Sequence, residues 1–198
     1  INYAHHIKGA QIGLFNYADS VRGIPLGLIS FVSHGYHKIE LSADEIFYAN
    51  LAFRTGVRQF YNILNVGFKP ETWNNTTTPS SVPEYGDWTF GYGVGTAPKI
   101  AKWLFLNFDF TSNHVNKGNF TNSLSLLNKL YLGFDFQVVR KFSITAGATL
   151  NAYLSDPGYS DNPVLFTDFS PRIFSEHNFP GSVNMKMWWG AKVGIRFL

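Results

Sequence analysis

The sequence predicts an all-β protein whose main body is an antiparallel up-and-down transmembrane β-barrel of about eight strands. Three observations predict this fold. Apolar and polar residues alternate along most of the 198 residues; aromatic residues make up 17% of the chain and charged residues only 15%; and short connections take turns with long ones. Soluble proteins usually have about 25% charged residues, so this composition is more typical of a protein with two dissimilar surfaces.

About eight segments after the N-terminal region alternate as a β-strand does. In NKLYLGFDFQV, Leu130, Leu132 and Phe134 fall on one face and Lys129 and Asp135 on the other, because successive side chains of a strand point to opposite faces. Several segments are long enough for a tilted strand to cross a bilayer, which takes about 9–11 residues. The segments lie at about 36–44, 46–56, 58–69, 87–97, 102–113, 125–139, 141–154 and 187–198.

The connections between these segments predict how the barrel stands in a membrane. Outer-membrane barrels have short turns on the periplasmic side and long loops outside, so the last strand is expected to end in the periplasm. The short connections are 55–58, 96–101 and 138–141, and the long ones, rich in Asn, Ser, Thr, Pro and Gly, are 69–86, 112–125 and 155–184.

The last segment, WWGAKVGIRFL, alternates apolar and polar residues and carries the aromatic Phe197 next to its end. It resembles the last strand of Gram-negative outer-membrane β-barrel proteins, which has this alternation and a near-terminal aromatic residue for the assembly machinery. The resemblance implies a multi-pass barrel in the bacterial outer membrane, with both termini in the periplasm. It also implies outer-membrane lipid and lipopolysaccharide as the surroundings of the barrel.

A soluble up-and-down barrel of the lipocalin kind is the alternative, because it also has eight strands. Its apolar face would point inward, and its polar face would be crowded with Lys and Glu. Here the polar face holds mainly Gly, Ser, Thr, Asn and Tyr with a few charges of both signs, which suits the interior of a narrow membrane barrel. The residues expected to form an ion network there are Glu40, Arg54, Asp109, Asp135, Lys192 and Arg196.

Residues 1–34 form a separate, glycine-rich segment with an internal repeat. INYAHHIKGAQIGL aligns with FNYADSVRGIPLGL at a spacing of 14 residues, and ISFVSHG begins a third copy. The pattern G-x-Q-x-G-L-x-N, read at GAQIGLFN, resembles the surface repeats of a group of bacterial envelope proteins. The copies are expected to form either a flattened β-solenoid or a meander that adds two strands to the barrel, making ten. Because repeat units need about three or more neighbours, we expect further copies upstream of Ile1. The barrel would occupy residues 35–198.

Two regions carry more large apolar residues than a solvated surface usually does. The repeat has few neighbouring copies to cover its apolar side chains, and the loop at 162–184 is rich in phenylalanine. The loop either folds over the barrel mouth or docks against another protein. The residues expected to contact a partner, another envelope protein, are Ile12, Leu14, Phe15, Leu26, Leu28, Phe31, Phe166, Phe169, Phe174 and Phe179.

The sequence gives little sign of metal, cofactor or nucleic-acid binding. It has no cysteine and no H-E-x-x-H motif, and its net charge of +3 is not gathered into blocks. The adjacent His5 and His6 would point to opposite faces of a strand. We therefore expect no metal, no cofactor and no nucleic-acid partner.

Three functions are compared for this chain: a lipid A-modifying enzyme, a small-solute pore and a non-enzymatic subunit. Some eight-stranded outer-membrane barrels are lipid A acyl-modifying enzymes that use a His with a Ser and an acid, and the groups here would be His114 with Ser112, or His177 with Ser175 and Glu176. Both groups lie in loops that are polar in any case, so no catalytic residue is assigned. A small-solute pore needs a wider lumen than eight strands leave. The sequence thus predicts a non-enzymatic structural or accessory subunit of a larger cell-envelope complex.

Overall fold

The computed structural model describes residues 2–69, 86–158, 165–166 and 170–197. In that part of the chain all regular structure is β, with thirteen strands in two separate sheets. The same residues contain no helix of the length and apolar character that would cross a membrane. The strands are β1 (Asn2–Ile12), β2 (Phe15–Leu26), β3 (Ile29–Val32), β4 (Tyr36–Asp44), β5 (Ala49–Val57), β6 (Phe60–Lys69), β7 (Asp87–Thr96), β8 (Lys99–Ala101), β9 (Leu104–Lys117), β10 (Ser125–Val139), β11 (Phe142–Ser155), β12 (Ile173–Asn178) and β13 (Asn184–Phe197).

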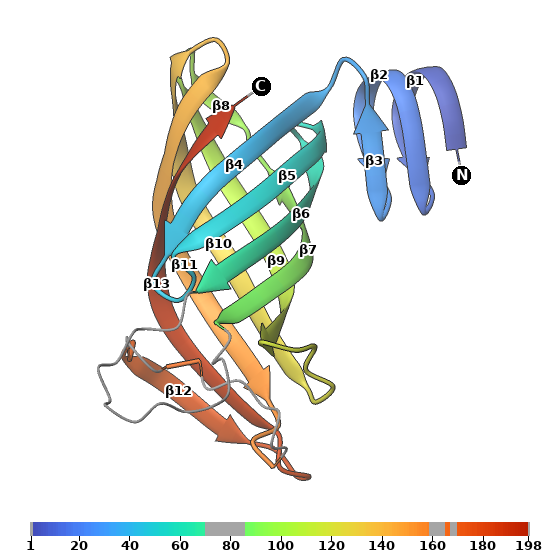
Figure 1. The fold of residues 1–198 in the computed structure, drawn as a ribbon. Helices are drawn as coiled ribbons and strands as arrows, with labels where there is room; N and C mark the ends of the chain where they lie inside the picture. Colours follow the sequence, from blue (N-terminus) through green and yellow to red (C-terminus); the bar gives the residue numbers. More distant parts are fainter. Residues whose placement is uncertain (1, 70–85, 159–164, 167–169, 198) are drawn as a thin grey trace.

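Eight of the described strands close into an antiparallel barrel (Figure 1), which confirms the predicted all-β barrel and its strand number. Each of them pairs with the next along the chain, from β4 through β5, β6, β7, β9, β10 and β11 to β13, and antiparallel pairing of β13 with β4 closes the cylinder. Closure gives each of these strands a neighbour on both sides, which is how barrels remove exposed sheet edges. The N and C termini lie toward the same end of the barrel, and β12 extends from the other end (Figure 1).

The observed ends of the eight barrel strands lie within four residues of the predicted ones. The largest difference is in β9, which continues to Lys117 because its last residues pair with the start of β7. The strand predicted from residue 46 begins at Ala49 instead. The Asp44 carboxylate accepts the backbone N–H groups of Ile46 and Phe47, at 3.0 and 2.8 Å, and so holds these residues in a turn.

Two short strands were not expected. β8 lies within the connection predicted as a plain turn at 96–101, and β12 lies within the predicted loop at 155–184. β12 forms because β13 reaches beyond the barrel: only Lys192–Phe197 pairs with β4, and the earlier part, Asn184–Trp188, accepts β12 along that side.

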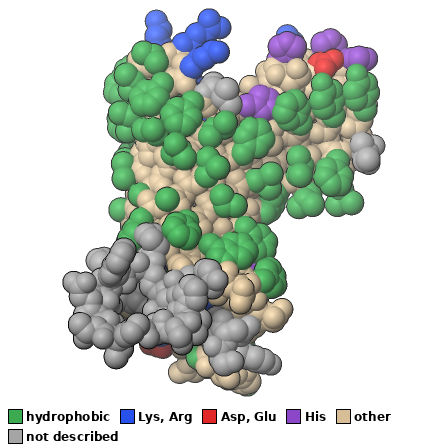
Figure 2. All heavy atoms as spheres, in the orientation of Figure 1, with side chains coloured by type: hydrophobic (Ala, Val, Ile, Leu, Met, Phe, Trp, Pro, Cys, Tyr) green, Lys and Arg blue, Asp and Glu red, His purple; other side chains and the backbone are tan. Residues whose placement is uncertain are grey.

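The two faces of the barrel wall differ sharply. Large apolar side chains cover the outside (Figure 2), with Leu132 and Val193 52% and 56% exposed. Charged side chains of the same strands point inward, and Asp135 and Arg196 are 2% and 0% exposed. The arrangement is the reverse of a soluble barrel with an apolar core. The other large apolar side chains exposed on the barrel strands include Leu41, Leu51, Leu64, Val66, Phe68, Phe90, Phe108, Phe110, Phe134, Phe136 and Ile144.

The N-terminal strands form their own sheet beside the barrel (Figure 1). β1, β2 and β3 pair in parallel, and each residue lies opposite the one 14 positions further along, as in Asn2↔Asn16 and Asn16↔Ser30. The chain therefore winds in coils of 14 residues, as in a β-solenoid. The repeat strands do not add to the barrel sheet.

Glycine allows the coils of this sheet to approach closely. A Cβ atom on Gly27 would lie 2.5 Å from the backbone oxygen of Gly13 in the preceding coil. A Cβ atom on Gly23, which has a φ of +150°, would lie even closer to the backbone oxygen of Gly9. A side chain at either position would push two coils apart, because neighbouring strands lie only about 4.8 Å from each other. The glycines that punctuate the repeat thus set its spacing.

Candidate functional site

The six charged residues predicted for the barrel interior lie together in the lumen, where positive and negative side chains alternate. The Arg54 guanidinium forms an ion pair with Glu40 at 2.8 Å, and Arg196 donates to the same Glu40 oxygen at 2.6 Å. Lys192 lies 3.2 Å from the other Glu40 oxygen. Arg54 also reaches Asp109 at 2.8 Å. The remaining member is Asp135, whose carboxylate is 3.3 Å from the Arg196 guanidinium.

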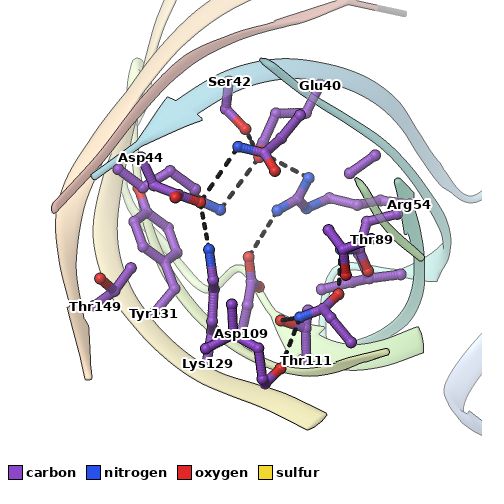
Figure 3. Close-up of a pocket in the computed structure, with 17 residues that line it drawn as sticks. Glu40, Ser42, Asp44, Arg54, Thr89, Asp109, Thr111, Lys129, Tyr131 and Thr149 are labelled. Carbon is purple, nitrogen blue, oxygen red and sulfur yellow. Dashed lines mark hydrogen bonds and ion pairs between the residues drawn. The ribbon is translucent and has the colours of Figure 1, made fainter. Parts of the chain in front are cut away.

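Neutral polar groups complete this network. The Tyr61 hydroxyl donates to Asp109 at 2.6 Å, and Arg196 donates to the Asn107 amide oxygen at 2.7 Å. Lys192 lies over the ring of Tyr131, 3.8 Å from its centroid. Seen down the barrel, the labelled side chains converge from opposite walls (Figure 3). Three acids and three bases neutralise one another, as buried charges require.

The lumen beside this network is almost filled. The cavity lined by the network and its neighbours has a volume of about 50 Å³, and a buried water needs about 10–15 Å³ of such space. A few water molecules would fit, but not a solute. In the described residues the lumen is therefore a packed polar core and not an open channel.

The end of the barrel opposite the termini is closed by an apolar cluster. Phe47, from the turn between β4 and β5, is completely buried there against Trp188 and Leu165. Glu45 in the same turn accepts from the indole N–H of Trp188 at 2.9 Å and from the Asn151 amide at 2.7 Å. The cluster comprises Ile46, Phe47, Val115, Leu127, Tyr153, Leu165 and Trp188.

The phenylalanines predicted as partner contacts in the 162–184 loop are in different surroundings. Phe166 packs edge-on against Trp188, with ring centroids 5.0 Å apart, and so helps to cover the barrel mouth. Phe174 and Phe179 are 51% and 40% exposed. Phe169 lies outside the described residues. Part of the loop thus folds over the mouth, while β12 and the turn after it present apolar side chains outward.

The last coil of the N-terminal sheet is hydrogen-bonded to the barrel. The Asn62 side chain accepts from the backbone N–H of Ser30 at 2.8 Å and donates to the Gly27 carbonyl at 2.9 Å. The Tyr92 hydroxyl donates to the same carbonyl, and the Thr55 hydroxyl donates to the Ser30 carbonyl. Asn62, Thr55 and Tyr92 therefore take the place that a fourth coil would have, and we call them the barrel cap.

A ladder of polar side chains runs through the coils toward this cap. The Asn2 amide donates to the Ile12 carbonyl of its own coil at 2.7 Å and to the Asn16 side-chain oxygen at 3.1 Å. Asn16 repeats the pattern one coil later, donating to Leu26 at 2.9 Å and to the Ser30 hydroxyl at 3.3 Å. The identity of Asn2 and Asn16 at the repeat spacing is the sequence signal for this ladder, which no catalytic or metal-binding motif indicates.

The apolar residues predicted as partner contacts in the repeat are all on the surface, and those of the first coil are the most exposed. Ile12 is 74% and Leu14 69% exposed, whereas their equivalents Leu26 and Leu28 are 39% and 48% exposed. Phe15 and Phe31 are 45% and 40% exposed. Each added coil thus covers part of the previous one, and the first coil lacks that cover among the described residues.

Neither histidine group considered for catalysis is assembled as a triad. The His114 ring stacks on Phe120, with ring centroids 5.0 Å apart, and bonds to Asn116. Glu176 accepts from Asn184 and lies near Lys186, and the His177 ring packs against Phe179. The described residues contain no group of three or more His, Asp or Glu side chains arranged to hold a metal ion. Of the repeat histidines, His5 bonds to Asp19 and His6 to Ser20.

Comparisons of this chain with protein-family models, curated proteins and solved structures find no match. The candidate functional regions are therefore defined by the geometry alone. They are the ion network, the barrel mouth covered by the apolar cluster around Phe47, and the three-stranded N-terminal sheet β1 to β3, which we call the coil stack.

Proposed function

We propose that this chain is a non-enzymatic outer-membrane β-barrel that acts as a structural or accessory subunit of a larger cell-envelope complex. The observation that carries the proposal is the inverted barrel wall, with Leu132 and Val193 facing outward and Asp135 and Arg196 buried inside. Water would penalise that apolar outer surface, whereas lipid would not. Tilted strands of 9 to 15 residues are also long enough to span a bilayer.

The orientation in the proposal follows from the connections. The end that carries the termini has the short turns, which hold Arg58, Lys99, Lys102, Arg140 and Lys141. The connections at the other end are 45–48, 70–86, 118–124 and 156–183, so the two longest connections of the barrel lie there, where β12 extends the sheet. Short turns on the periplasmic side and long loops outside are the rule for bacterial barrels. The three-stranded N-terminal sheet would then lie in the periplasm.

A structural or accessory role is favoured over the two alternatives by the packed lumen and by the surroundings of the two histidines. A pore is disfavoured because the cavity in the ion network is only about 50 Å³. A lipid A-modifying enzyme is disfavoured because His114 and His177 make ring contacts with phenylalanines and no hydrogen bond to Ser112 or Ser175 among the described residues. What the molecule does offer is a rigid barrel that fixes a short solenoid at one end.

A topology experiment tests the membrane part of this proposal. One variant receives a protease site between Pro180 and Gly181, and a matched variant receives it between Arg140 and Lys141; all four residues are exposed turn positions at opposite ends of the barrel. Protease added to intact cells should cut the first variant and leave the second intact. In permeabilised cells, the protease should cut both variants. Equal cleavage of the two variants in intact cells would refute the proposed topology.

The accessory role is tested by co-purification. Tagged protein extracted in mild detergent from native outer membranes should bring down another envelope protein in a stoichiometric amount, and a tagged unrelated barrel should not. Recovery of the chain alone, after chemical cross-linking in intact cells, would remove the accessory role while leaving the barrel assignment in place.

A further inference from the structure

The coil stack lies against the outer face of the barrel wall. Thr55 and Asn62 pair with each other in β5 and β6. Their neighbours Arg54 and Ile63 are buried inside the barrel, so the side chains of this pair point outward, as that of Leu64 does. Thr55 and Asn62 are nevertheless buried, because the last coil covers them and bonds to both. The stack thus occupies part of the face on which the other strands carry large apolar side chains.

Charged and apolar side chains lie at opposite ends of the stack. His5 and Asp19 bond to each other across two coils, and Ile12 and Leu26 follow them by half of the 14-residue coil. Figure 2 shows histidine and charged side chains at the end of the stack that is level with the basic short turns of the barrel, and hydrophobic side chains below them. The charged and histidine side chains of residues 2–34 are His5, His6, Lys8, Asp19, Arg22 and His34.

The apolar end is exposed even in the coil that has neighbours on both sides. β2 pairs with β1 and with β3, yet Leu26 and Leu28 at its end are 39% and 48% exposed. Tyr17 also points outward from β2, whereas Asn16 and Ala18 on either side of it are buried within the stack. This coil is therefore apolar outside and partly polar inside, which is the same arrangement as in the barrel wall.

The backbone at the apolar end already has hydrogen-bond partners. The Leu26 carbonyl accepts from the Gly13 N–H at 3.0 Å and from the Asn16 amide at 2.9 Å. The Gly27 carbonyl accepts from two side chains of the barrel cap. Hydrocarbon strongly penalises backbone polar groups that lack such partners. These internal bonds therefore make the bend of the coil compatible with lipid.

A row of aromatic rings connects the stack to the outer wall of the barrel. Tyr17 stacks on Phe31 with ring centroids 5.9 Å apart, and Phe31 lies 4.6 Å from the ring of His37. His37 in turn stacks on Phe53 at 6.4 Å. Phe53 is on the outer face of β5, since its neighbour Ala52 is buried inside. The apolar surface of the stack is thus continuous with the wall that faces lipid in the proposed function.

The contact lies near the end of the wall that carries the short turns. Asn62 is two residues from the start of β6 at Phe60, and Tyr92 is four residues from the end of β7 at Thr96. Two to four strand residues cover about 7–14 Å, and the hydrocarbon of one leaflet is roughly 15 Å thick. Because the bend at Gly27 bonds to both Asn62 and Tyr92, the apolar end reaches the depth of a single leaflet.

We infer that the apolar end of the coil stack is inserted in the periplasmic leaflet of the membrane, where lipid acyl chains cover Leu14, Leu26 and Leu28. The charged end, with Lys8 and Arg22, lies in the water of the periplasm. The inference rests on the proposed outer-membrane barrel, and it names lipid as the cover of this part of the repeat in place of another protein. The stack is then a second contact with the bilayer, of the interfacial kind.

Fluorescence quenching of single labels tests this inference. The chain has no cysteine, so Leu28→Cys, Arg22→Cys and Leu132→Cys each place one dye in the whole protein, reconstituted into lipid nanodiscs. Lipids brominated on their acyl chains quench a dye in hydrocarbon, and iodide quenches a dye in water. Brominated lipid should quench the dye at position 28 at least about half as strongly as the dye at position 132, since interfacial segments enter a leaflet by about 5–10 Å. Iodide should quench the dye at position 22.

Further variants separate insertion from a change in folding. Leu26→Cys places the dye beside the same bend and should respond as Leu28→Cys does. With the dye at position 26, Leu28→Glu should lower quenching by brominated lipid at least about twofold, because a carboxylate resists entry into hydrocarbon. Lys8→Glu puts the same carboxylate at the charged end and should leave the quenching unchanged. Unchanged hydrogen exchange of the β2 and β3 amides in detergent would show that the stack is folded in each variant.

Three results would overturn the inference. They are equal quenching of positions 28 and 22 by iodide, shielding of position 28 from both quenchers, which would indicate cover by protein, and unchanged lipid quenching at position 26 with Leu28→Glu. If brominated lipid still quenches position 132 in these cases, the proposed barrel stands and only the insertion of the stack is wrong. Quenching of position 132 by iodide would instead remove the membrane barrel itself.

Discussion

The barrel and the coil stack are both made of β-strands, but they complete their backbone hydrogen bonding in opposite ways. The barrel pairs antiparallel strands until β13 meets β4, and no strand of the cylinder is left at an edge. The coil stack pairs parallel strands at 14-residue spacing, and β1 has one neighbouring strand among the described residues. A closed sheet has no unpaired edge and needs no further strand to span a membrane. The end strand of an open sheet can pair with another strand. The proposed function accordingly gives the barrel the role of membrane anchor.

The largest expected effect comes from breaking the ion network of the barrel. Arg196 is 0% exposed, and Arg196→Met removes the cation that pairs with Glu40 and Asp135. Loss of one member of a buried charge cluster costs about 3–5 kcal/mol of unfolding free energy. Urea unfolding in detergent micelles measures the loss. Lys141→Met, at an exposed turn, is the control and should change little. A loss of less than about 1 kcal/mol for Arg196→Met would mean that the pairs do not hold the lumen together.

The next effect separates lipid from water as the surroundings of the outer wall. Leu132→Arg places a cation on the outward face of β10, where lipid contact would make it cost about 2–4 kcal/mol. The conservative Leu132→Ile should change stability by less than about 1.5 kcal/mol. Folding titrations into lipid vesicles give both values. Neutral or improved stability of Leu132→Arg would indicate that this face meets water.

A smaller and local effect is expected in the coil stack. Asn16→Leu removes the side-chain bonds to Leu26 and Ser30 at a position that is 4% exposed. Leaving these buried partners unpaired costs about 1–3 kcal/mol. Hydrogen exchange should quicken in β1 and β2 and stay unchanged in β4 to β13. An equal rise in the hydrogen-exchange rate of the barrel amides would show that the two regions unfold as one unit.

The smallest effect on stability is expected at the outward side of β12. Phe174 is 51% exposed and stacks on Trp189, so Phe174→Ser should change the unfolding free energy by only about 0.5 kcal/mol. The same variant should reduce recovery of a co-purified partner if β12 contributes to the contact surface. Phe166→Ser is the contrast, because Phe166 packs on Trp188 over the barrel mouth and its loss should lower stability more.

The sequence predicted the barrel wall because alternation is a local property. Leu132 and Asp135 fall on opposite faces of a strand wherever that strand lies, so their directions follow from spacing alone. The pairs inside the lumen could not be predicted in this way. Glu40 and Arg196 lie 156 residues apart and meet only because β13 closes on β4.

The features that the sequence did not predict depend on tertiary pairing. Phe47 looked like part of a strand, but the Asp44 carboxylate bends the chain and directs Phe47 into the barrel mouth. β12 looked like polar loop, and it is a strand only because β13 extends past β4. The 14-residue identity of the repeat was compatible with a solenoid or with a meander, and parallel pairing of Asn2 with Asn16 distinguishes them.

The central claim is that the apolar outside of the barrel lies in lipid, and spin labels test it most directly. The chain has no cysteine, so Leu132→Cys, Val193→Cys and Lys141→Cys each provide a single labelling site in protein reconstituted into bilayers. Labels at positions 132 and 193 should collide more often with oxygen, which concentrates in lipid, than with a water-soluble nickel chelate, and the label at position 141 should show the opposite order. Greater accessibility of positions 132 and 193 to the nickel chelate would contradict the account.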